Sequence, residues 1–172
     1  MPTMNADRPP TFDPQKGPYA PPLEGPAAAV LGQPARALAL LAGARVLVVE
    51  DEADSRELIC ALLERAGAKV LCVESVAKAM DGVYRSFDPD VVLTDFSMPD
   101  ADGLDLIREF RKAPSTRAVL VPILVLSGHS GVRWRELALE AGAADLLTKP
   151  FEPAVLIARI AAAVASGRSG PN

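Results

Sequence analysis

Acidic side chains follow two strand-like apolar runs in this chain of 172 residues. Glu50 and Asp51 come directly after the run at 45–49, and Asp95 closes the run that begins at Val91. In open α/β sheets, ligands bind at the edge where the carboxyl ends of parallel strands meet. If the two strands are neighbours, the three carboxylates share one small pocket and repel one another unless a cation lies among them. Hard oxygen ligands with open water positions suit Mg²⁺ better than a transition metal.

Two more strand-like runs end in hydrogen-bond donors, Ser127 and Lys149. A hydroxyl and an ammonium are the donors that a phosphoryl group on a carboxylate needs. Simpler interpretations stay open for each residue alone: Glu50 and Asp51 can cap the following helix, the aspartate can cap a loop, the serine can form a turn, and the lysine can be a solvated charge. Together on four strand ends, these groups favour phosphoryl chemistry.

The composition argues against several classes of protein. With a formal net charge of -4 and no cluster of Lys and Arg, the chain lacks the electrostatic term that dominates nucleic-acid binding, so we expect no direct DNA or RNA contact. The sequence has no secretory leader pattern and no apolar stretch long enough to span a bilayer, which predicts a cytoplasmic protein without membrane contact. Cys60 and Cys72 lack metal-ligand spacing, and we expect buried, reduced thiols.

The chain divides into three parts by composition. Residues 1–43 are rich in proline and poor in apolar residues, so we expect a disordered extension, with a short helix over 35–42 just before the fold. The alternative is a docking tail for a proline-binding module. Residues 44–166 form the folded domain, and 167–172 are a polar stub. Nothing follows the last predicted helix, so we expect a protein that acts without an attached output domain.

Strand-like runs alternate with helix-length segments throughout the folded domain, which predicts an α/β protein with a parallel sheet. In the first helix, Leu58, Leu62 and Ala66 share a face that we expect to be buried. The expected strands are 45–49, 69–73, 91–95, 122–126 and 144–147, and the expected helices are 53–66, 76–86, 103–112, 132–141 and 152–165.

Several motifs in register resemble the receiver domain of two-component response regulators, over about residues 44–165. These are Val-Val-Glu-Asp-Glu at 48–52, Asp95 with Met98-Pro99 and Asp102-Gly103-Leu104, Ser127-Gly128, and Gly142-Ala143-Ala144-Asp145 before Lys149-Pro150-Phe151. The resemblance implies a doubly wound (βα)5 flavodoxin-like three-layer sandwich, with a parallel five-stranded sheet of order 2-1-3-4-5. The chain is similar to a stand-alone receiver of the chemotaxis-regulator kind.

The resemblance also implies a role for each site residue. Asp95 is then the phosphoacceptor, and Ser127 and Lys149 are the conserved hydroxyl and lysine that contact the phosphoryl group. Mg²⁺ is the implied cofactor, and its implied ligands are Glu50, Asp51, Asp95 and the backbone carbonyl of Ser97. The implied partners are a sensor histidine kinase or a histidine phosphotransfer protein and a downstream protein target. We expect a non-enzymatic monomer or weak homodimer whose surface at the fourth helix, fifth strand and fifth helix changes on phosphorylation.

The chain departs from the family pattern at Leu146, where receivers commonly carry an aromatic switch residue. A rotating Tyr or Phe is therefore not the reporter here, so the signal travels through backbone and aliphatic packing, or the protein serves mainly as a phosphate carrier. His129 is expected to be an exposed loop residue without a catalytic duty, although the family's phosphoryl lifetime is set partly at that position. Trp134 is expected to pack on the sheet, the alternative being an exposed anchor for a partner.

Two other functions compete with this interpretation. A degenerate receiver would bind partners without phosphorylation, and Leu146 leaves room for it. A magnesium-dependent phosphohydrolase also forms an aspartyl phosphate, but such enzymes carry Asp-x-Asp after the first strand, whereas Asp95 ends the third strand and precedes Phe96-Ser97.

Overall fold

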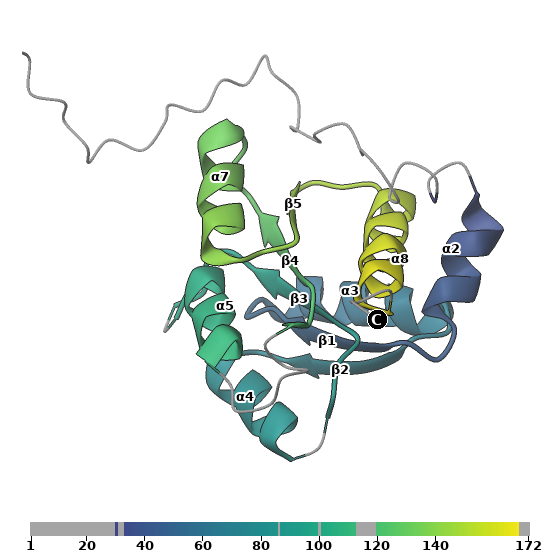
Figure 1. The fold of residues 1–172 in the computed structure, drawn as a ribbon, viewed down its shortest axis with the longest axis horizontal. Coiled ribbons are helices and arrows are strands. Elements are labelled where there is room, and N and C mark those ends of the chain that lie inside the picture. The colour runs from purple at the N-terminus through teal and green to yellow at the C-terminus, as the bar shows by residue number, and fades with distance from the viewer. Residues whose placement is uncertain (1–29, 31–32, 86, 100, 113–119, 169–172) are drawn as a thin grey trace, which may run out of the picture.

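In the computed structural model of this chain, strands and helices alternate as the sequence predicts (Figure 1). The structure describes residues 30, 33–85, 87–99, 101–112 and 120–168. The strands are β1 (Arg45–Val49), β2 (Lys69–Val73), β3 (Val91–Asp95), β4 (Ile123–Ser127) and β5 (Asp145–Thr148). The helices are α2 (Pro34–Leu41), α3 (Ala53–Arg65), α4 (Val76–Tyr84), α5 (Gly103–Lys112), α7 (Val132–Ala141) and α8 (Pro153–Arg168).

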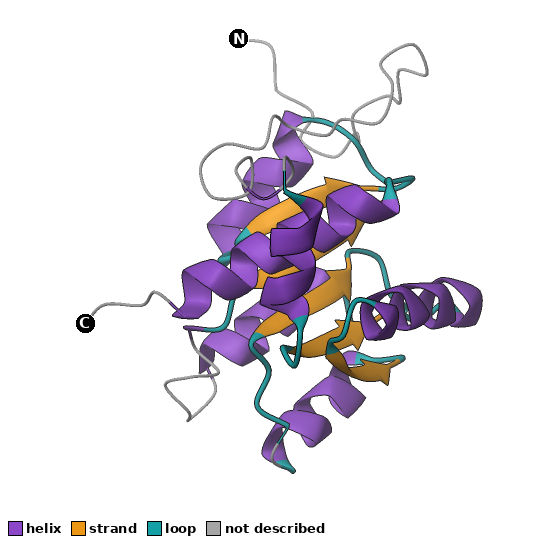
Figure 2. Cartoon of the chain, turned by 90° about the vertical axis from the view of Figure 1, so that its right-hand side faces the viewer, coloured by secondary structure: helices purple, strands orange, loops and turns teal. Residues whose placement is uncertain are grey.

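All strand pairs are parallel, and the sheet order is β2-β1-β3-β4-β5, which confirms the predicted 2-1-3-4-5 topology. β1 therefore lies beside β3, with Val49 in register with Thr94. Every residue of β3 is buried because helices cover both faces of the sheet (Figure 2). The sequence shows this as a continuous apolar run rather than an alternating one.

Alternate residues of each strand supply the two halves of the core, because successive side chains point to opposite faces of a sheet. Val46 and Val48 of β1 join the core under α2, α3 and α8. Leu47 and Val49 join the core under α4, α5 and α7. The helices thus lie in two layers on opposite sides of the sheet (Figures 1 and 2), which confirms the three-layer sandwich.

The predicted buried face of α3 is correct in part: Ala66 is buried and Leu62 packs against the core, but Leu58 does not. Leu58 is 72% exposed, and the helix instead buries Ile59, Cys60 and Leu63. Ile59 and Leu63 are four residues apart, as Leu58 and Leu62 are, so two neighbouring faces are about equally apolar. Periodicity alone cannot choose between them.

The prediction of free thiols is also wrong in this structure, because Cys60 and Cys72 form a disulfide. Cys60 lies on the buried side of α3, and Cys72 lies on β2, against which α3 packs. The separation between the two Cα atoms is 6.5 Å, within the range that disulfides span. Neither the spacing nor the composition of the sequence shows that this helix and this strand face each other.

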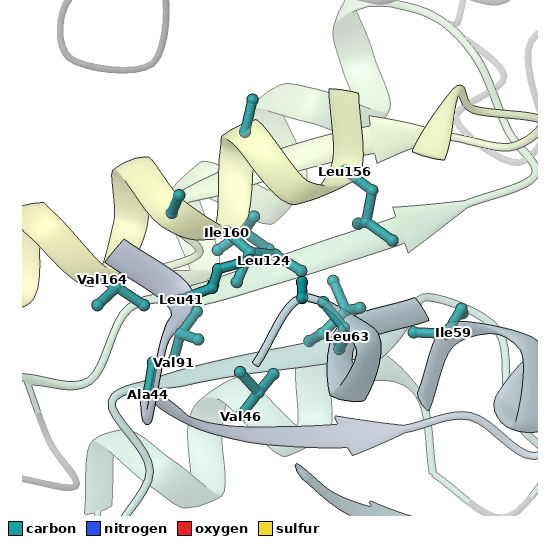
Figure 3. Close-up of a cluster of buried hydrophobic side chains, with 14 of the residues drawn as sticks. Leu41, Ala44, Val46, Ile59, Leu63, Val91, Leu124, Leu156, Ile160 and Val164 are labelled. Carbon is teal, nitrogen blue, oxygen red and sulfur yellow. The ribbon is translucent and has the colours of Figure 1, made fainter. Parts of the chain in front are cut away.

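The folded core begins before residue 44. α2 packs against α8 and buries Ala37 and Leu41, so the helix expected just ahead of the domain is part of its core. Figure 3 shows Leu41 lying among side chains of α8 and of the sheet. At the other end, α8 continues to Arg168, beyond the predicted end at 165. The disorder expected for residues 1–29 falls outside the described residues.

β4 and β5 each begin one residue later than expected. Pro122 has no N–H to donate to a neighbouring strand, and it contributes only its carbonyl, which accepts from the N–H of Val92 at 2.9 Å.

Among the residues that the structure describes, no helix has the length and apolarity required to span a bilayer.

Leu41→Ala should lower the free energy of unfolding by about 2–4 kcal/mol, because it leaves a cavity under a fully buried side chain. Leu38→Ala, one turn earlier on the same helix, is the matched control, because Leu38 is 45% exposed. Urea denaturation of both variants measures the difference. If the two variants unfold with the same midpoint as the wild type, α2 is not part of the cooperative core.

Candidate functional site

Three carboxylates converge at the carboxyl edge of the sheet. Glu50 and Asp51 follow β1, Asp95 ends β3, and one oxygen from each lies within 4.8 Å of the others. The neighbouring positions of β1 and β3 bring these groups together, as the sequence predicted. Glu50 is 2% and Asp95 8% exposed. An all-oxygen, largely buried set of this size is the donor chemistry that Mg²⁺ prefers, so the residues fit the predicted ion.

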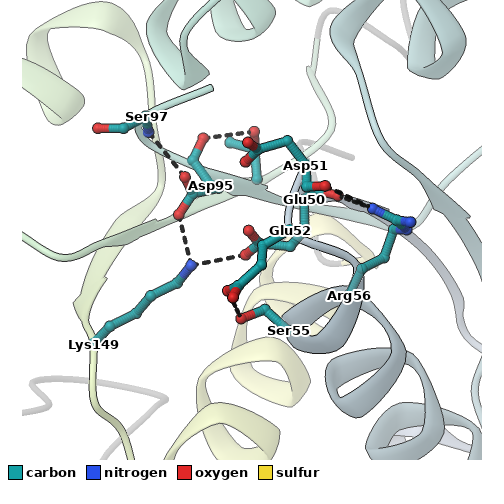
Figure 4. Close-up of polar contacts among 9 residues, drawn as sticks. Glu50, Asp51, Glu52, Ser55, Arg56, Asp95, Ser97 and Lys149 are labelled. Carbon is teal, nitrogen blue, oxygen red and sulfur yellow. Dashed lines mark hydrogen bonds and ion pairs between the residues drawn. The ribbon is translucent and has the colours of Figure 1, made fainter. Parts of the chain in front are cut away.

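Lys149 joins two of these carboxylates (Figure 4). Its Nζ lies 2.7 Å from Asp95 Oδ1 and 2.8 Å from Glu50 Oε2. The lysine follows β5, and its own N–H donates to the carbonyl of Ser127 at 2.7 Å, which fixes the base of the side chain against β4. The Lys149–Pro150 peptide bond is cis. The ammonium therefore lies within the acidic cluster rather than in solvent.

The pKa values in this cluster follow from burial and from the ion pairs. Burial raises the pKa of Glu50 above its ordinary value, although the hydrogen bond from Lys149 opposes the shift. Burial alone would lower the pKa of Lys149, but hydrogen bonds to Asp95 and Glu50 outweigh it, and the pKa is raised. Lys149 thus carries its charge at neutral pH, close to where a phosphoryl group on Asp95 would lie.

The side chain of Asp95 is held at both oxygens. While Oδ1 binds Lys149, Oδ2 accepts a hydrogen bond from the N–H of Ser97 at 3.0 Å (Figure 4). Ser97, whose backbone carbonyl is a predicted metal ligand, is exposed at the start of the following loop. The orientation of the Asp95 carboxylate is thus fixed by two hydrogen bonds.

α5 begins very close to the Asp95 backbone. A Cβ on Gly103 would lie 2.6 Å from the carbonyl oxygen of Asp95, a distance that real Cβ atoms do not adopt. The N–H of Gly103 donates to the carbonyl of Phe96 at 3.0 Å. Asp102 caps the helix, as predicted, by accepting from the N–H of Asp105 at 2.8 Å. The glycine therefore allows a capped helix to start directly under the acidic cluster.

Ser127 lies at the end of β4 and is fully buried. Its Oγ accepts a hydrogen bond at 2.9 Å from the backbone N–H of His129. Asp95 pairs in register with Leu126, so the serine extends one residue farther toward the same edge. The structure thus places the predicted hydroxyl on the strand adjacent to Asp95, with its oxygen engaged by its own loop.

An aromatic cluster that the sequence did not predict surrounds this loop. The rings of His129 and Trp134 stack at a centroid distance of 4.7 Å, and Phe96 meets Trp134 edge-on at 5.2 Å. His129 is exposed, as expected, and Trp134 packs against the core as the preferred interpretation predicted. Leu146 is buried in the same half of the core. Although position 146 is not aromatic, aromatic packing still links the loops after β3 and β4 to α7.

Arg56 of α3 is the contact residue that sequence reasoning missed. Its Nη1 donates to the backbone carbonyls of Glu50 at 2.7 Å and Asp51 at 3.1 Å (Figure 4). An arginine in the second turn of a helix is common on solvated surfaces, so only its position five residues after the acid pair could have drawn notice.

Comparisons with known proteins agree with this geometry. A family model described as the response regulator receiver domain matches residues 46–161. The phosphate regulon transcriptional regulatory protein PhoB of Escherichia coli is 38% identical over 118 residues, which are 69% of this chain and 50% of that protein. The transcriptional regulatory protein CseB of Streptomyces avermitilis is 38% identical over 129 residues, 74% of this chain and 52% of that protein. The chain spans about half the length of the curated relatives it matches.

Solved structures show the same likeness. The chemotaxis response regulator CheY4 of Vibrio cholerae superposes with a TM-score of 0.64 at 25% identity, covering 70% of this chain and 98% of that chain. A response regulator receiver domain protein from Clostridium thermocellum gives a TM-score of 0.64 at 30% identity, covering 73% and 98%. With the sheet order, the acidic cluster and the lysine already in place, these matches show that the chain belongs to the response regulator receiver family.

Proposed function

We propose that this chain takes a phosphoryl group onto Asp95 from a phosphohistidine and changes its surface for a protein partner as a result. The observation that carries this proposal is the convergence of Asp95, Lys149 and the acid pair at one buried edge of the sheet. The donor would be a sensor histidine kinase or a histidine phosphotransfer protein in the cytoplasm. Receiver domains are typically signal transducers rather than enzymes, and we propose no turnover of substrate for this chain.

The proposed reaction is a displacement at phosphorus. A carboxylate oxygen of Asp95 attacks the phosphorus of the phosphohistidine, a P–O bond forms, and the P–N bond breaks. The imidazole leaves with the electron pair of that bond and takes up a proton. Ser97 and Lys149 keep the carboxylate oriented for attack, because they bind its two oxygens. The ammonium of Lys149 balances negative charge on the transferred oxygens.

The residues proposed to hold the cofactor are Glu50, Asp51, Asp95 and the backbone carbonyl of Ser97. Bound there, Mg²⁺ would supply further positive charge to the phosphoryl oxygens. Glu50 and Asp51 contribute the negative charge that binds the ion. Ser127 would follow the phosphoryl group once it is formed, which requires its hydroxyl to turn toward Asp95 from its present hydrogen bond with His129.

The proposed output surface is α7, β5 and α8, and the aromatic cluster gives it a direct connection to the site. A shift of the loop at 127–129 changes the position of the His129 ring, which stacks on Trp134 of α7. The relatives named transcriptional regulators are about twice as long as the segment they share with this chain. We keep the prediction that this segment itself binds a protein target and not nucleic acid, given its net charge of -4.

Asp95→Asn should abolish labelling by acetyl phosphate in the presence of Mg²⁺, measured as the mass of the intact protein, because an amide does not attack phosphorus at a useful rate. Asp102→Asn is the matched control, since asparagine caps a helix as well as aspartate does and the residue lies in the next loop. Full labelling of Asp95→Asn would assign the acceptor to another residue. Unlabelled wild type would favour a degenerate receiver.

Beryllofluoride with Mg²⁺ should change the fluorescence of Trp134, the only tryptophan, because the mimic moves the loop whose His129 ring stacks on the indole. A fluorescence titration measures the change, and Asp95→Asn should remove it. A response that persists in Asp95→Asn would show that the signal does not come from the acceptor site.

Lys149→Met should lower the free energy of unfolding by about 2 kcal/mol near neutral pH, because it leaves Glu50 and Asp95 buried without their cation. Because the pKa of Lys149 is raised above 10.5, its ammonium stays charged through the neutral range, and its contribution is lost on the alkaline side only as the pH rises through that raised pKa. The raised pKa of Glu50 means that this carboxyl protonates above its ordinary 4.5 as the pH falls. The deficit of the variant should therefore shrink toward about pH 5.

Denaturation curves between about pH 5 and pH 8 measure this pH dependence. Lys78→Met is the control, because Lys78 pairs with Glu74 on the exposed surface and its loss should change stability little at any pH. A deficit that is the same at both ends of the range would mean that Lys149 acts through packing of its stem rather than through charge.

A further inference from the structure

Arg56 makes contacts with the acidic turn that no role described so far requires. The half-buried side chain extends from α3 back toward the end of β1, away from Asp95 (Figure 4). One guanidinium nitrogen donates to two consecutive carbonyls, those of Glu50 and Asp51. It therefore binds the backbone of the acid pair and not their carboxylates.

These two hydrogen bonds complete a set that fixes the turn. The N–H of Glu50 donates to the carbonyl of Val73 on β2 at 3.1 Å, so the same residue is held at both its backbone groups. After the pair, the side chain of Glu52 accepts from Ser55 at 2.5 Å. Because the Cα–Cβ direction of a residue follows from its backbone, fixing the two peptide groups fixes the direction in which the Glu50 and Asp51 side chains leave the turn.

The positive charge of Arg56 weakens the binding of a metal ion, whereas its ordering of the turn strengthens that binding. A guanidinium close to a divalent site repels the ion, so its removal would, by charge alone, tighten binding. Loss of the two hydrogen bonds would loosen the turn and require the carboxylates to be ordered when the ion binds, which weakens binding. Charge and positioning thus predict changes of opposite sign.

We infer that Arg56 is a positioning residue for the metal site: it orders the backbone of Glu50 and Asp51 so that their carboxylates meet Asp95, and it strengthens Mg²⁺ binding in spite of its own charge. The inference rests on the proposed function, since it takes the acidic cluster to be the Mg²⁺ site. It gives a task to a residue outside the acceptor, the metal ligands, the serine and the lysine.

The test is the Mg²⁺ dissociation constant of the full chain by isothermal titration calorimetry. Arg56→Gln should raise the dissociation constant about three- to tenfold, the effect of losing a hydrogen bond of ordinary strength. Arg56→Lys keeps the charge, but its side chain is one bond shorter and does not bring its ammonium to the position from which Nη1 binds both carbonyls. Its dissociation constant should therefore lie between those of the wild type and Arg56→Gln. Arg65→Gln, which removes an exposed arginine from the last turn of the same helix, should bind as the wild type does.

Each result decides between the alternatives. If Arg56→Gln binds Mg²⁺ as tightly as the wild type or more tightly, positioning is refuted while the proposed metal site stands. If the wild type does not bind Mg²⁺, both the site and the inference are wrong.

Thermal melting in EDTA distinguishes a structural role of Arg56 from a positioning role. Substitution of a residue that only stabilises the fold lowers the melting temperature and leaves the dissociation constant of the folded protein unchanged. Should Arg56→Gln fail to fold, Arg56→Lys must still bind more weakly, and an unchanged constant overturns the inference.

Discussion

Mutual repulsion among Glu50, Asp51 and Asp95 is the constraint on which the rest of the site depends. Oxygens of three carboxylates within 4.8 Å of one another, two of the groups buried, are tolerable only if positive charge lies among them. Neighbouring strands lie about 4.8 Å apart, so β5 is about 10 Å from β3 in the plane of the sheet. The side chains of Lys149 and Asp95 together span that distance, because their ends meet in a hydrogen bond of 2.7 Å. The compensating charge can therefore come from Lys149, which is far away in both sequence and sheet order.

The two cations of the site divide the work between side chains and backbone. Lys149 binds carboxylate oxygens and therefore competes for the same atoms that a metal ion or a phosphoryl group would use. Arg56 binds carbonyl oxygens behind the acids and competes with neither. Lys149 thus offsets the negative charge of the carboxylates directly, whereas Arg56 holds the backbone that carries two of them.

The order of the elements and the residues that converge could be predicted, because they depend on local patterns. The continuous apolar run ending in Asp95 indicated a central strand, and four chemically matched strand ends indicated one edge. The predictions that were wrong depended on contacts between distant elements. Leu58 was assigned to the buried face because two faces of α3 are similarly apolar, and the Cys60–Cys72 bond depends on the packing of α3 against β2. The stack of His129 on Trp134 and the reach of Arg56 depend on rotamers, which no spacing rule specifies.

The close approach of α5 to the end of β3 limits which substitutions this sequence can accept. At position 103 the space beside the Asp95 carbonyl admits a hydrogen atom and nothing larger, so a substitution there has to move either the helix or Asp95. Position 102 needs only a side-chain oxygen for the cap and can vary among several residue types. Two adjacent positions thus tolerate very different substitutions: position 103 is limited by volume, and position 102 is limited by hydrogen bonding.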